Sequence, residues 1–232
     1  MGFLLSLNVG QKRPVAAKSG FSGIDKRPVA GPVMLRSPGP KHGGLGSGLV
    51  GDEIIDVANH GGDDQAVYAY AREDLDVWST ELGRPLLPGF FGENLTTTGI
   101  DVNGALVGER WRIGDEVELQ VTLPRIPCRT FAVWMDQRGW IKTWVSRATP
   151  GAYLRIVRPG ELRSGDPVTV VHQPAHDITI AMVFRALTVE PDLLPLLLNA
   201  DDLPADARNL AERRTSLALD AEPASQPSNS RT

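Results

Sequence analysis

The clearest pattern in the chain is the alternation of apolar and polar residues between Glu116 and Leu123, where every second residue is Val or Leu. A period of two predicts a strand that buries one face. Other short runs rich in branched and aromatic residues end at Gly, Pro or polar turn residues, which is typical of strands. These runs are Phe3–Val9, Ile54–Ala58, Val67–Tyr70, Tyr153–Val157 and Pro167–Val171.

Helical spacing is found in the middle of the chain and in its last quarter. Arg72–Leu82 has apolar residues three and four positions apart and stops before Gly83, and Gly139–Arg147 carries two Trp residues four apart. Helices of about a dozen residues are marginal on their own, so those near the C-terminus must pack together or on the strands. The last-quarter helices are predicted at Thr179–Leu187, Pro191–Leu198 and Pro204–Arg214.

The glycine and proline content favours a fold of many short strands. The 232 residues include 24 Gly and 18 Pro, together about 18% of the chain. The usual combined share of these two residues is about 12%. Together with the strand pattern, this predicts a mainly β domain over residues 1–173, a barrel or sandwich with a few helices. Residues 174–216 are expected to form a three-helix extension. Residues 217–232, rich in Pro, Ser and Asn, are expected to be a disordered tail.

Charge and cysteine count argue against several classes of protein. The 24 Lys and Arg against 28 Asp and Glu give a net charge of −4, whereas a general nucleic-acid binder or membrane-surface protein is basic. No apolar run reaches the roughly 18 residues of a transmembrane helix, and the N-terminal residues do not resemble a signal peptide. One cysteine permits no intramolecular disulfide. We therefore expect a cytoplasmic protein that binds neither a nucleic-acid duplex nor a membrane.

The single cysteine is the strongest candidate for chemistry. Cys128 follows the best strand in a loop stiffened by Pro124 and Pro127, and Arg125 and Arg129 lie near it in the sequence. Nearby cations lower the pKa of a cysteine and populate the thiolate, which is the nucleophilic and metal-binding form. A lone cysteine is also commonly a small buried hydrophobe. This segment alone supports the two interpretations equally.

Basic residues in two loops suggest an anion-binding pocket. Lys26 and Arg27 lie between loop glycines, and together with Arg125 and Arg129 they would form a cationic pocket in an acidic chain. A solvated basic loop is the alternative. The four histidines and the cysteine lack the spacing of a zinc site.

Two further segments contain groups suited either to a ligand or to their own loop. His60 precedes Gly61 and Gly62, and paired glycines permit close backbone approach to a ligand or make a tight turn. Glu93 and Asn94 follow Phe91-Gly92, where they would fix the loop through hydrogen bonds or hold a ligand atom.

Taken together, these segments resemble the MOSC domain, named for the C-terminal domain of molybdenum-cofactor sulfurase, and within it the YiiM-type bacterial proteins. The resemblance covers about residues 1–172, and the C-terminal helices resemble the three-helix extension of that subgroup. Each segment is weak alone, but their order is specific. The segments are Ile24–Val29, Gly51–Glu53, His60–Gly62, Phe91–Leu95, Gly114–Asp115, Pro124–Cys128, Tyr153–Val157 and Gly165–Asp166.

The resemblance implies a MOSC-type β-barrel with a pocket for the molybdenum cofactor, whose metal would be bound by Cys128. It also implies proton delivery, for which His60 and Glu93 are the candidates. The cofactor carries a phosphate and a pterin, which suits basic and polar loop residues. The implied cofactor-binding residues are Lys26, Arg125, Arg129, Gly61, Gly62 and Asn94.

The function implied is the reduction of N-hydroxylated compounds, of the hydroxylaminopurine type, by molybdenum. The chain has no dinucleotide fingerprint and too few cysteines for an iron–sulfur cluster, so the resemblance implies a separate flavoprotein as electron donor. Two alternatives remain open. One is a carrier of the molybdenum cofactor, or of sulfur as a Cys128 persulfide, and the other is a non-enzymatic module whose C-terminal helices bind a partner.

Overall fold

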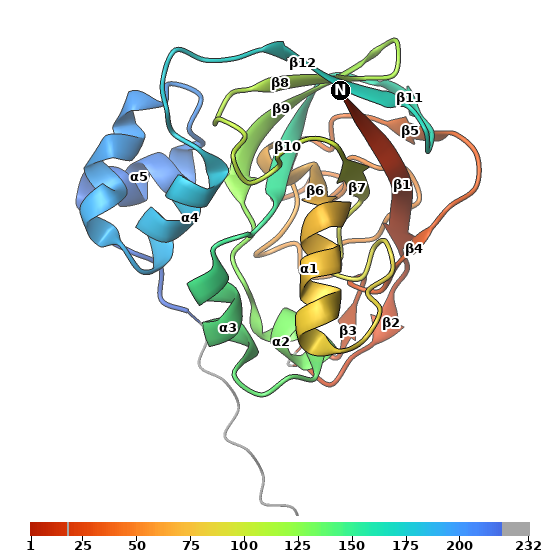
Figure 1. Ribbon diagram of the computed structural model, residues 1–232, viewed down its shortest axis with the longest axis horizontal. Coiled ribbons are helices and arrows are strands. Elements are labelled where there is room, and N and C mark those ends of the chain that lie inside the picture. Colours follow the sequence, from red (N-terminus) through yellow and green to blue (C-terminus); the bar gives the residue numbers. More distant parts are fainter. Residues whose placement is uncertain (18, 220–232) are drawn as a thin grey trace, which may run out of the picture.

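The centre of the molecule is a closed β-barrel (Figure 1). The computed structural model describes residues 1–17 and 19–219. The barrel strands are β1 (Gly2–Gly10), β6 (Val67–Ala71), β7 (Leu95–Thr98), β8 (Arg110–Ile113), β9 (Val117–Pro124), β10 (Ala152–Arg158) and β12 (Pro167–His172). Within the described chain they follow in the order β12-β8-β9-β10-β6-β7-β1, and antiparallel pairing of β12 with β1 closes the ring. The mainly β fold predicted from the sequence is confirmed.

Shorter strands extend or flank the barrel. β4 (Lys26–Pro28) pairs with the end of β1 and carries the sheet beyond the barrel. β5 (Val33–Leu35) pairs with β11 (Gly160–Leu162), and β2 (Arg13–Pro14) pairs with β3 (Phe21–Ser22). The pairing of β4 with β1 places Lys26 opposite Gly10, at the end of the first barrel strand.

Period-two alternation decides what fills the barrel and what faces outward. On β10, Leu154 and Ile156 are buried in the barrel core, whereas Tyr153 and Arg155 point to the opposite face and are less buried. The predicted strand Glu116–Leu123 is confirmed as β9. The outer face of β9 and β10 is therefore the face on which side chains are available to a ligand.

The sequence prediction of a strand at Ile54–Ala58 is wrong. This segment runs through turns, in which the backbone N–H of His60 donates to the carbonyl of Asp56 at 3.0 Å. Val57 remains 47% exposed, so the run buries too little apolar surface to form a barrel strand. His60 consequently follows a turn and not a strand.

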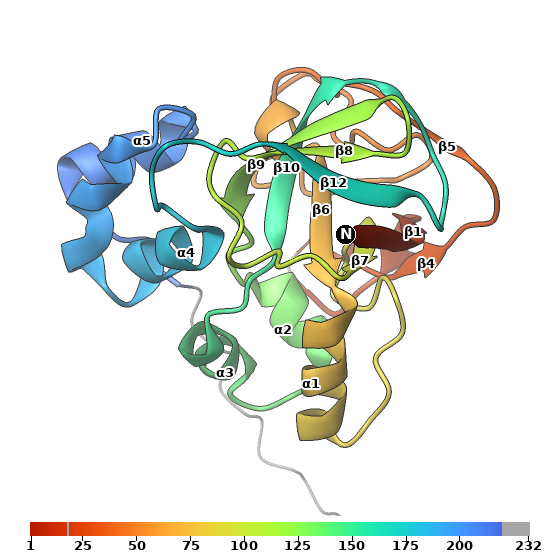
Figure 2. The same cartoon turned by 45° about the horizontal axis from the view of Figure 1, so that its top comes forward.

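Three helices gather at one end of the barrel, below the strands in Figures 1 and 2. They are α1 (Arg72–Leu82), α2 (Arg129–Met135) and α3 (Trp140–Arg147). Between them lies an aromatic cluster whose ring centroids are 4.9–6.2 Å apart. The aromatic cluster consists of Trp78, Phe91, Phe131, Trp140 and Trp144, all with at most 1% exposure.

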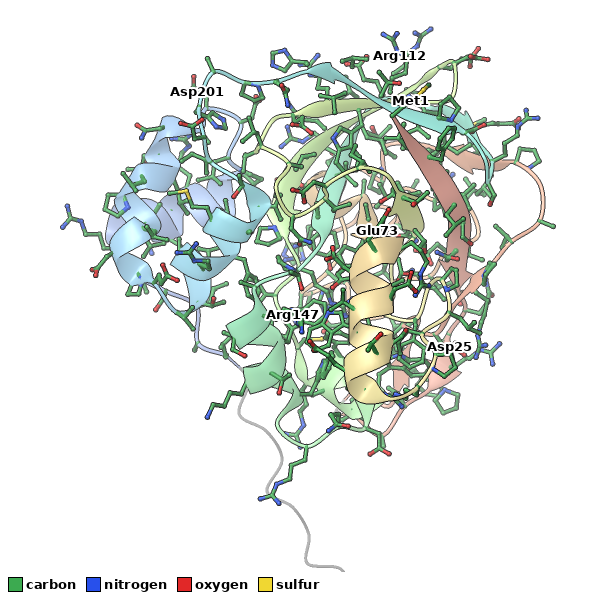
Figure 3. The ribbon with its side chains drawn as sticks, viewed as in Figure 1. Met1, Asp25, Glu73, Arg112, Arg147 and Asp201 are labelled. Atoms are coloured by element: carbon green, nitrogen blue, oxygen red, sulfur yellow. The ribbon has the colours of Figure 1, made fainter. Side chains whose placement is uncertain are left out.

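Two of the three helices around the aromatic cluster were predicted from the sequence, and the third was not. α1 coincides with the predicted Arg72–Leu82, and α3 lies within the predicted Gly139–Arg147. Helix α2 was not predicted, because its Thr, Phe, Val and Trp residues have modest helix propensity and the helix depends on packing. Arg147 joins α3 to α1 through an ion pair with Glu81 and lies over the ring of Trp78. Figure 3 labels Arg147 between these two helices.

The C-terminal helices stand beside the barrel, next to β9 (Figures 1 and 2). α4 (Ile180–Thr188) begins at Thr179, whose hydroxyl accepts a hydrogen bond from the N–H of Met182 at 3.1 Å. The second predicted helix is a 3₁₀ helix, η2 (Pro191–Asn199), because Pro195 inside it lacks the N–H that an α-helix requires. α5 (Ala205–Arg213) completes the group. Apart from Phe184, their buried apolar residues belong to the same buried cluster as the barrel core.

The chain keeps contact with the core at Leu217, just past the predicted boundary at residue 216. The N–H of Leu217 donates to the carbonyl of Leu187 at 2.8 Å, and Leu217 packs against the core. The packed chain therefore extends past residue 216, and residues 220–232, where the rest of the predicted tail falls, lie outside the described residues. No helix in the described ranges has the length and apolar character needed to cross a membrane.

Candidate functional site

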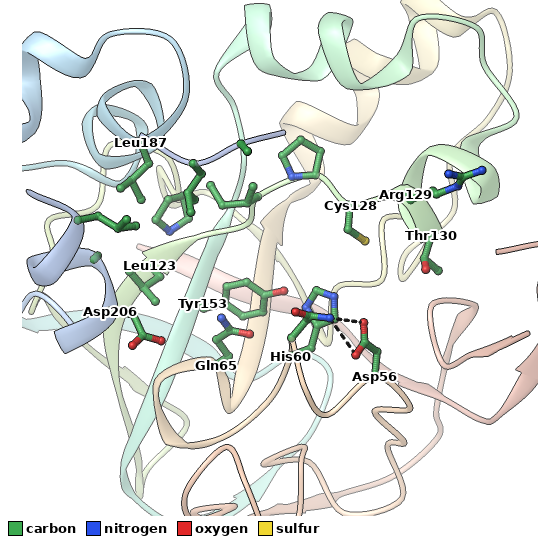
Figure 4. Close-up of a pocket in the computed structure, with 18 of the residues that line it drawn as sticks. Asp56, His60, Gln65, Leu123, Cys128, Arg129, Thr130, Tyr153, Leu187 and Asp206 are labelled. Carbon is green, nitrogen blue, oxygen red and sulfur yellow. Dashed lines mark hydrogen bonds between the residues drawn. The ribbon is translucent and has the colours of Figure 1, made fainter. Parts of the chain in front are cut away.

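The loop from β9 to α2 opens on a cavity of about 860 Å³. Cys128 lies directly before α2, is partly buried, and turns its sulfur toward the space near His60 and Tyr153 (Figure 4). The cavity has a polar side formed by loops and an apolar side formed by the C-terminal helices. The polar side includes Asp56, Asn59, His60 and Gln65, and the apolar side includes Leu187, Ala207, Leu210 and Leu217.

The electrostatic surroundings of Cys128 favour its thiolate. Burial raises the pKa of the thiol. The opposing effects lower the pKa by more than burial raises it: they are a hydrogen bond with the His60 side chain, the charges of Arg125 and His60, and a hydrogen bond with the backbone N–H of Phe131. The resulting pKa is about 7, against an ordinary value of 9.0. A large fraction of Cys128 is therefore anionic at neutral pH, which favours the functional interpretation over that of an inert core residue.

The arginine that acts on the thiol is Arg125. Its side chain is buried, it donates to the carbonyl of Phe91, and its guanidinium carbon lies 4.1 Å from the ring centre of Phe131. No Asp or Glu of the described chain forms an ion pair with Arg125. Arg129 is exposed, and Figure 4 shows its guanidinium directed away from the sulfur. The structure thus separates two arginines that the sequence had placed together.

A smaller pocket of about 100 Å³ adjoins Cys128 and contains several predicted cofactor-binding residues. Lys26, Asn94 and Arg125 all line it. The ammonium of Lys26 is paired with the buried carboxylate of Asp52, which also accepts a hydrogen bond from Asn94 Nδ2 at 3.0 Å. Part of the Lys26 charge is therefore already neutralised, and Arg125 is the less compensated cation of the pocket.

A comparison with protein families covers the segments that form this site. The model of the MOSC domain family matches residues 56–169, a range that includes His60, Arg125 and Cys128. The uncharacterized protein YflK of Bacillus subtilis is 30% identical over 184 residues, which are 78% of this chain and 79% of YflK. The chain belongs to the MOSC domain family.

Two further relatives extend the comparison of this MOSC protein. The crystal structure of YiiM from Geobacillus stearothermophilus matches it with a TM-score of 0.73 and 26% identity, covering 93% of this chain and 100% of that one. A protein of Gibberella moniliformis named "Reductase" is 27% identical over 209 residues, 88% of this chain but only 35% of that protein. The YiiM fold therefore extends over nearly the whole chain, and one relative carries the name of a redox enzyme.

Glu93 of the MOSC domain is not brought to either pocket. Its carboxylate is fully buried and accepts hydrogen bonds from the N–H groups of Gly89 and Phe91 at 2.6 and 3.0 Å, and from the hydroxyl of Thr96 at 2.9 Å. Burial raises the pKa of Glu93. These contacts make Glu93 a support of its own loop, and its side chain lines neither of the two cavities that contain Cys128.

Gly61 and Gly62 have a role in packing that the sequence left open. Both have positive φ, 87° and 83°, which favours glycine. A Cβ at Gly62 would come 2.7 Å from the backbone of Lys41, and one at Gly61 would come 2.8 Å from the carbonyl of Gly46. Their close approach is thus to the preceding glycine-rich loop. Gly61 also lines the smaller pocket, whereas Gly62 borders neither of the two cavities that contain Cys128.

Sequence reasoning missed Tyr153 and the apolar side of the cavity. Tyr153 lines both cavities from the outer face of β10, and its position opposite Leu154 in an alternating strand was the available signal. Leu187 and Leu210 come from α4 and α5, so their presence beside Cys128 depends on how the C-terminal helices pack. No pattern within those helices indicates that contact.

Proposed function

We propose that this MOSC protein is a molybdenum-cofactor enzyme that reduces N-hydroxylated compounds, with Cys128 as its protein ligand to the metal. The observation that carries the proposal is the Cys128 thiol, which opens on a cavity while His60 and Arg125 favour its anionic form. A soft thiolate suits molybdenum in an oxo and dithiolene environment. The relative named "Reductase" supports a redox role.

The residues around Cys128 fit the cofactor. Among residues 1–17 and 19–219, no three His, Cys, Asp or Glu side chains come together to hold a metal ion. A metal bound at Cys128 must therefore bring its other ligands with it, as a dithiolene-bearing pterin does. Arg125, buried without a carboxylate partner in the described chain, would supply positive charge to the Cys128 ligand and to the anionic cofactor beside it. Lys26 and Asn94 line the same pocket.

The reaction converts R–NHOH, two electrons and two protons to R–NH₂ and water, so the N–O bond breaks and the nitrogen is reduced. When bound, the cofactor supplies the two-electron exchange. The chain itself holds the thiolate through His60 and Arg125, and excludes water on one side through Leu187 and Leu210. One cysteine is too few for an iron–sulfur cluster, and the 232 residues contain no dinucleotide fingerprint. The resemblance to YiiM-type proteins supports a separate flavoprotein as the electron donor.

The test is to produce the full chain in a host that makes the molybdenum cofactor. Elemental analysis and the fluorescence of the oxidised pterin should give molybdenum and pterin in equal amounts. The loaded protein should reduce 6-hydroxylaminopurine to adenine with reduced methyl viologen as electron donor. Protein that leaves such a host without molybdenum would contradict the proposal. Sulfane sulfur released by cyanide, without turnover of the hydroxylamine, would favour a persulfide carrier instead.

A further inference from the structure

The three tyrosines of the chain differ in what their hydroxyl groups contact. The hydroxyl of Tyr68 donates to the carbonyl of Pro150 at 2.6 Å. That of Tyr70 donates to the carbonyl of Thr149 at 2.9 Å. The hydroxyl of Tyr153 forms no hydrogen bond with another residue of the described chain, although its ring is partly buried. Because buried phenols normally have a hydrogen-bond partner, this hydroxyl is the one among the three tyrosines that is available to a bound molecule.

The position of Tyr153 is fixed by the strand and by a neighbouring ring. It leaves the outer face of β10, and its ring centre is 5.2 Å from that of Tyr68. Figure 4 shows the hydroxyl directed toward His60 and the space beside Cys128. Tyr153 lines both the 860 Å³ cavity and the smaller pocket, so it stands where the two meet. A molecule held where the two cavities meet borders both Tyr153 and Cys128.

Two other donors on this side of the cavity are already engaged. The amide of Asn59 donates to both carboxylate oxygens of Asp56, at 3.1 and 3.0 Å (Figure 4). His60 is the hydrogen-bond partner of Cys128. Tyr153 therefore offers a donor on a rigid ring, which loses little conformational freedom when a ligand binds.

We propose that Tyr153 is a catalytic residue whose hydroxyl donates a hydrogen bond to the substrate oxygen as the N–O bond breaks; this rests on the proposed reductase function. In that step the flavoprotein supplies two electrons, water supplies two protons, and the oxygen leaves as water. Tyr153 keeps its own proton and stabilises the charge that develops on the departing oxygen. Donors aimed at such a developing charge stabilise the transition state more than the bound substrate.

The test compares Tyr153→Phe with Tyr70→Phe in the molybdenum-loaded protein. Tyr70 borders neither cavity, and its hydroxyl accepts from Trp78 Nε1 at 2.9 Å, so Tyr70→Phe should lower Tm by several degrees and keep kcat within twofold. Tyr153→Phe should keep Tm within about two degrees and lower kcat for 6-hydroxylaminopurine at least tenfold, with a smaller change in KM.

A binding measurement without electron donor provides a readout that does not depend on turnover. Tyr153→Phe should raise the Kd of 6-hydroxylaminopurine about three- to tenfold, the loss of one hydrogen bond. The Kd of adenine, which lacks the oxygen, should change less than twofold. If the parent is active and Tyr153→Phe matches it in kcat and in both Kd values, only the role of Tyr153 is overturned. If the loaded parent does not reduce the hydroxylamine, the proposed function and this inference fail together.

Discussion

The two sides of the Cys128 loop are built in opposite ways. Beneath it lies the aromatic cluster, with rings at most 1% exposed and packed against one another. Above it lies a cavity bordered by polar loop residues and the C-terminal helices. Arg125 belongs to the packed side, where Phe131 covers its guanidinium, and His60 belongs to the open side. The thiolate is therefore favoured by a fixed buried charge from one side and by a hydrogen bond from a surface loop on the other.

The two sides of the Cys128 loop therefore have different roles. A close-packed side resists displacement, so Arg125 provides a constant positive charge near the thiol. The open side provides space for a substrate and the groups that contact it. Substitutions on the packed side should therefore affect stability or cofactor retention, and substitutions on the open side should affect thiol titration and turnover.

The largest effect is expected from Cys128→Ser, because it removes the thiol whose anionic form both sides of the loop stabilise. A serine hydroxyl is far less acidic than a thiol and binds a soft metal poorly. Molybdenum content and hydroxylaminopurine reduction should fall to background. The change is nearly isosteric at a partly buried position, so Tm should shift by only a degree or two. A Cys128→Ser protein with full molybdenum content would contradict the assignment of the ligand.

Arg125→Met and Lys26→Met should separate the two buried cations of the small pocket. Arg125→Met should weaken cofactor retention about ten- to a hundredfold, the loss of one charge-assisted hydrogen bond. Lys26→Met leaves the Asp52 carboxylate buried without its cation, so its main effect should be a loss of about 3 kcal/mol in the free energy of unfolding. The measurements are pterin content after dialysis and urea denaturation.

Arg125→Lys is the control for that pair, because it keeps the charge and loses the planar contact with Phe131. Cofactor retention in Arg125→Lys should lie between that of the parent and that of Arg125→Met. Equal retention in all four proteins would show that neither cation holds the cofactor.

The sequence predicted those parts of the fold in which local patterns and tertiary packing agree. The alternation in β9 and the apolar spacing in α1 both describe faces that the structure buries. The strand predicted at Ile54–Ala58 was wrong and helix α2 was not predicted, because the backbone conformation of both segments depends on distant packing partners. In α2 that partner is the aromatic cluster, which draws on rings from four separate segments.

In the candidate site too, contacts within one loop could be predicted from the sequence, whereas contacts between distant segments could not. Cys128 and Arg125 could be linked from the sequence because they lie in one loop. The contact between Cys128 and His60 joins segments far apart in the chain, and sequence reasoning proposed each residue without their pairing. Tyr153 was overlooked because a tyrosine in a strand is ordinarily a packing residue. Arg129 was favoured by its adjacency to Cys128, but adjacent residues at the start of a helix point in different directions.

Trp140→Phe tests whether the aromatic cluster acts on stability alone. Trp140 is fully buried and its Nε1 has no hydrogen-bond partner in the described chain, so the change removes volume without breaking a bond. We expect the free energy of unfolding to fall by about 1–2 kcal/mol. The alkylation rate of Cys128 and its pH dependence should stay the same. A changed thiol pKa would mean that the aromatic cluster and the thiol are coupled more closely than the contacts of Arg125 indicate.

His60→Gln should produce the smallest and most specific effect, an upward shift of the Cys128 pKa. His60 lowers the thiol pKa through a hydrogen bond and through its charge, whereas Arg125 and the N–H of Phe131 would still act in the variant. The pKa should therefore rise from about 7 but stay below the ordinary 9.0. Because only the thiolate reacts, carboxamidomethylation of the cofactor-free protein at pH 7 should slow about three- to tenfold. Above the new pKa both proteins are fully ionised, so their rates should converge at high pH. A uniform slowing at every pH would mean that His60 controls access to the sulfur and leaves its ionisation unchanged.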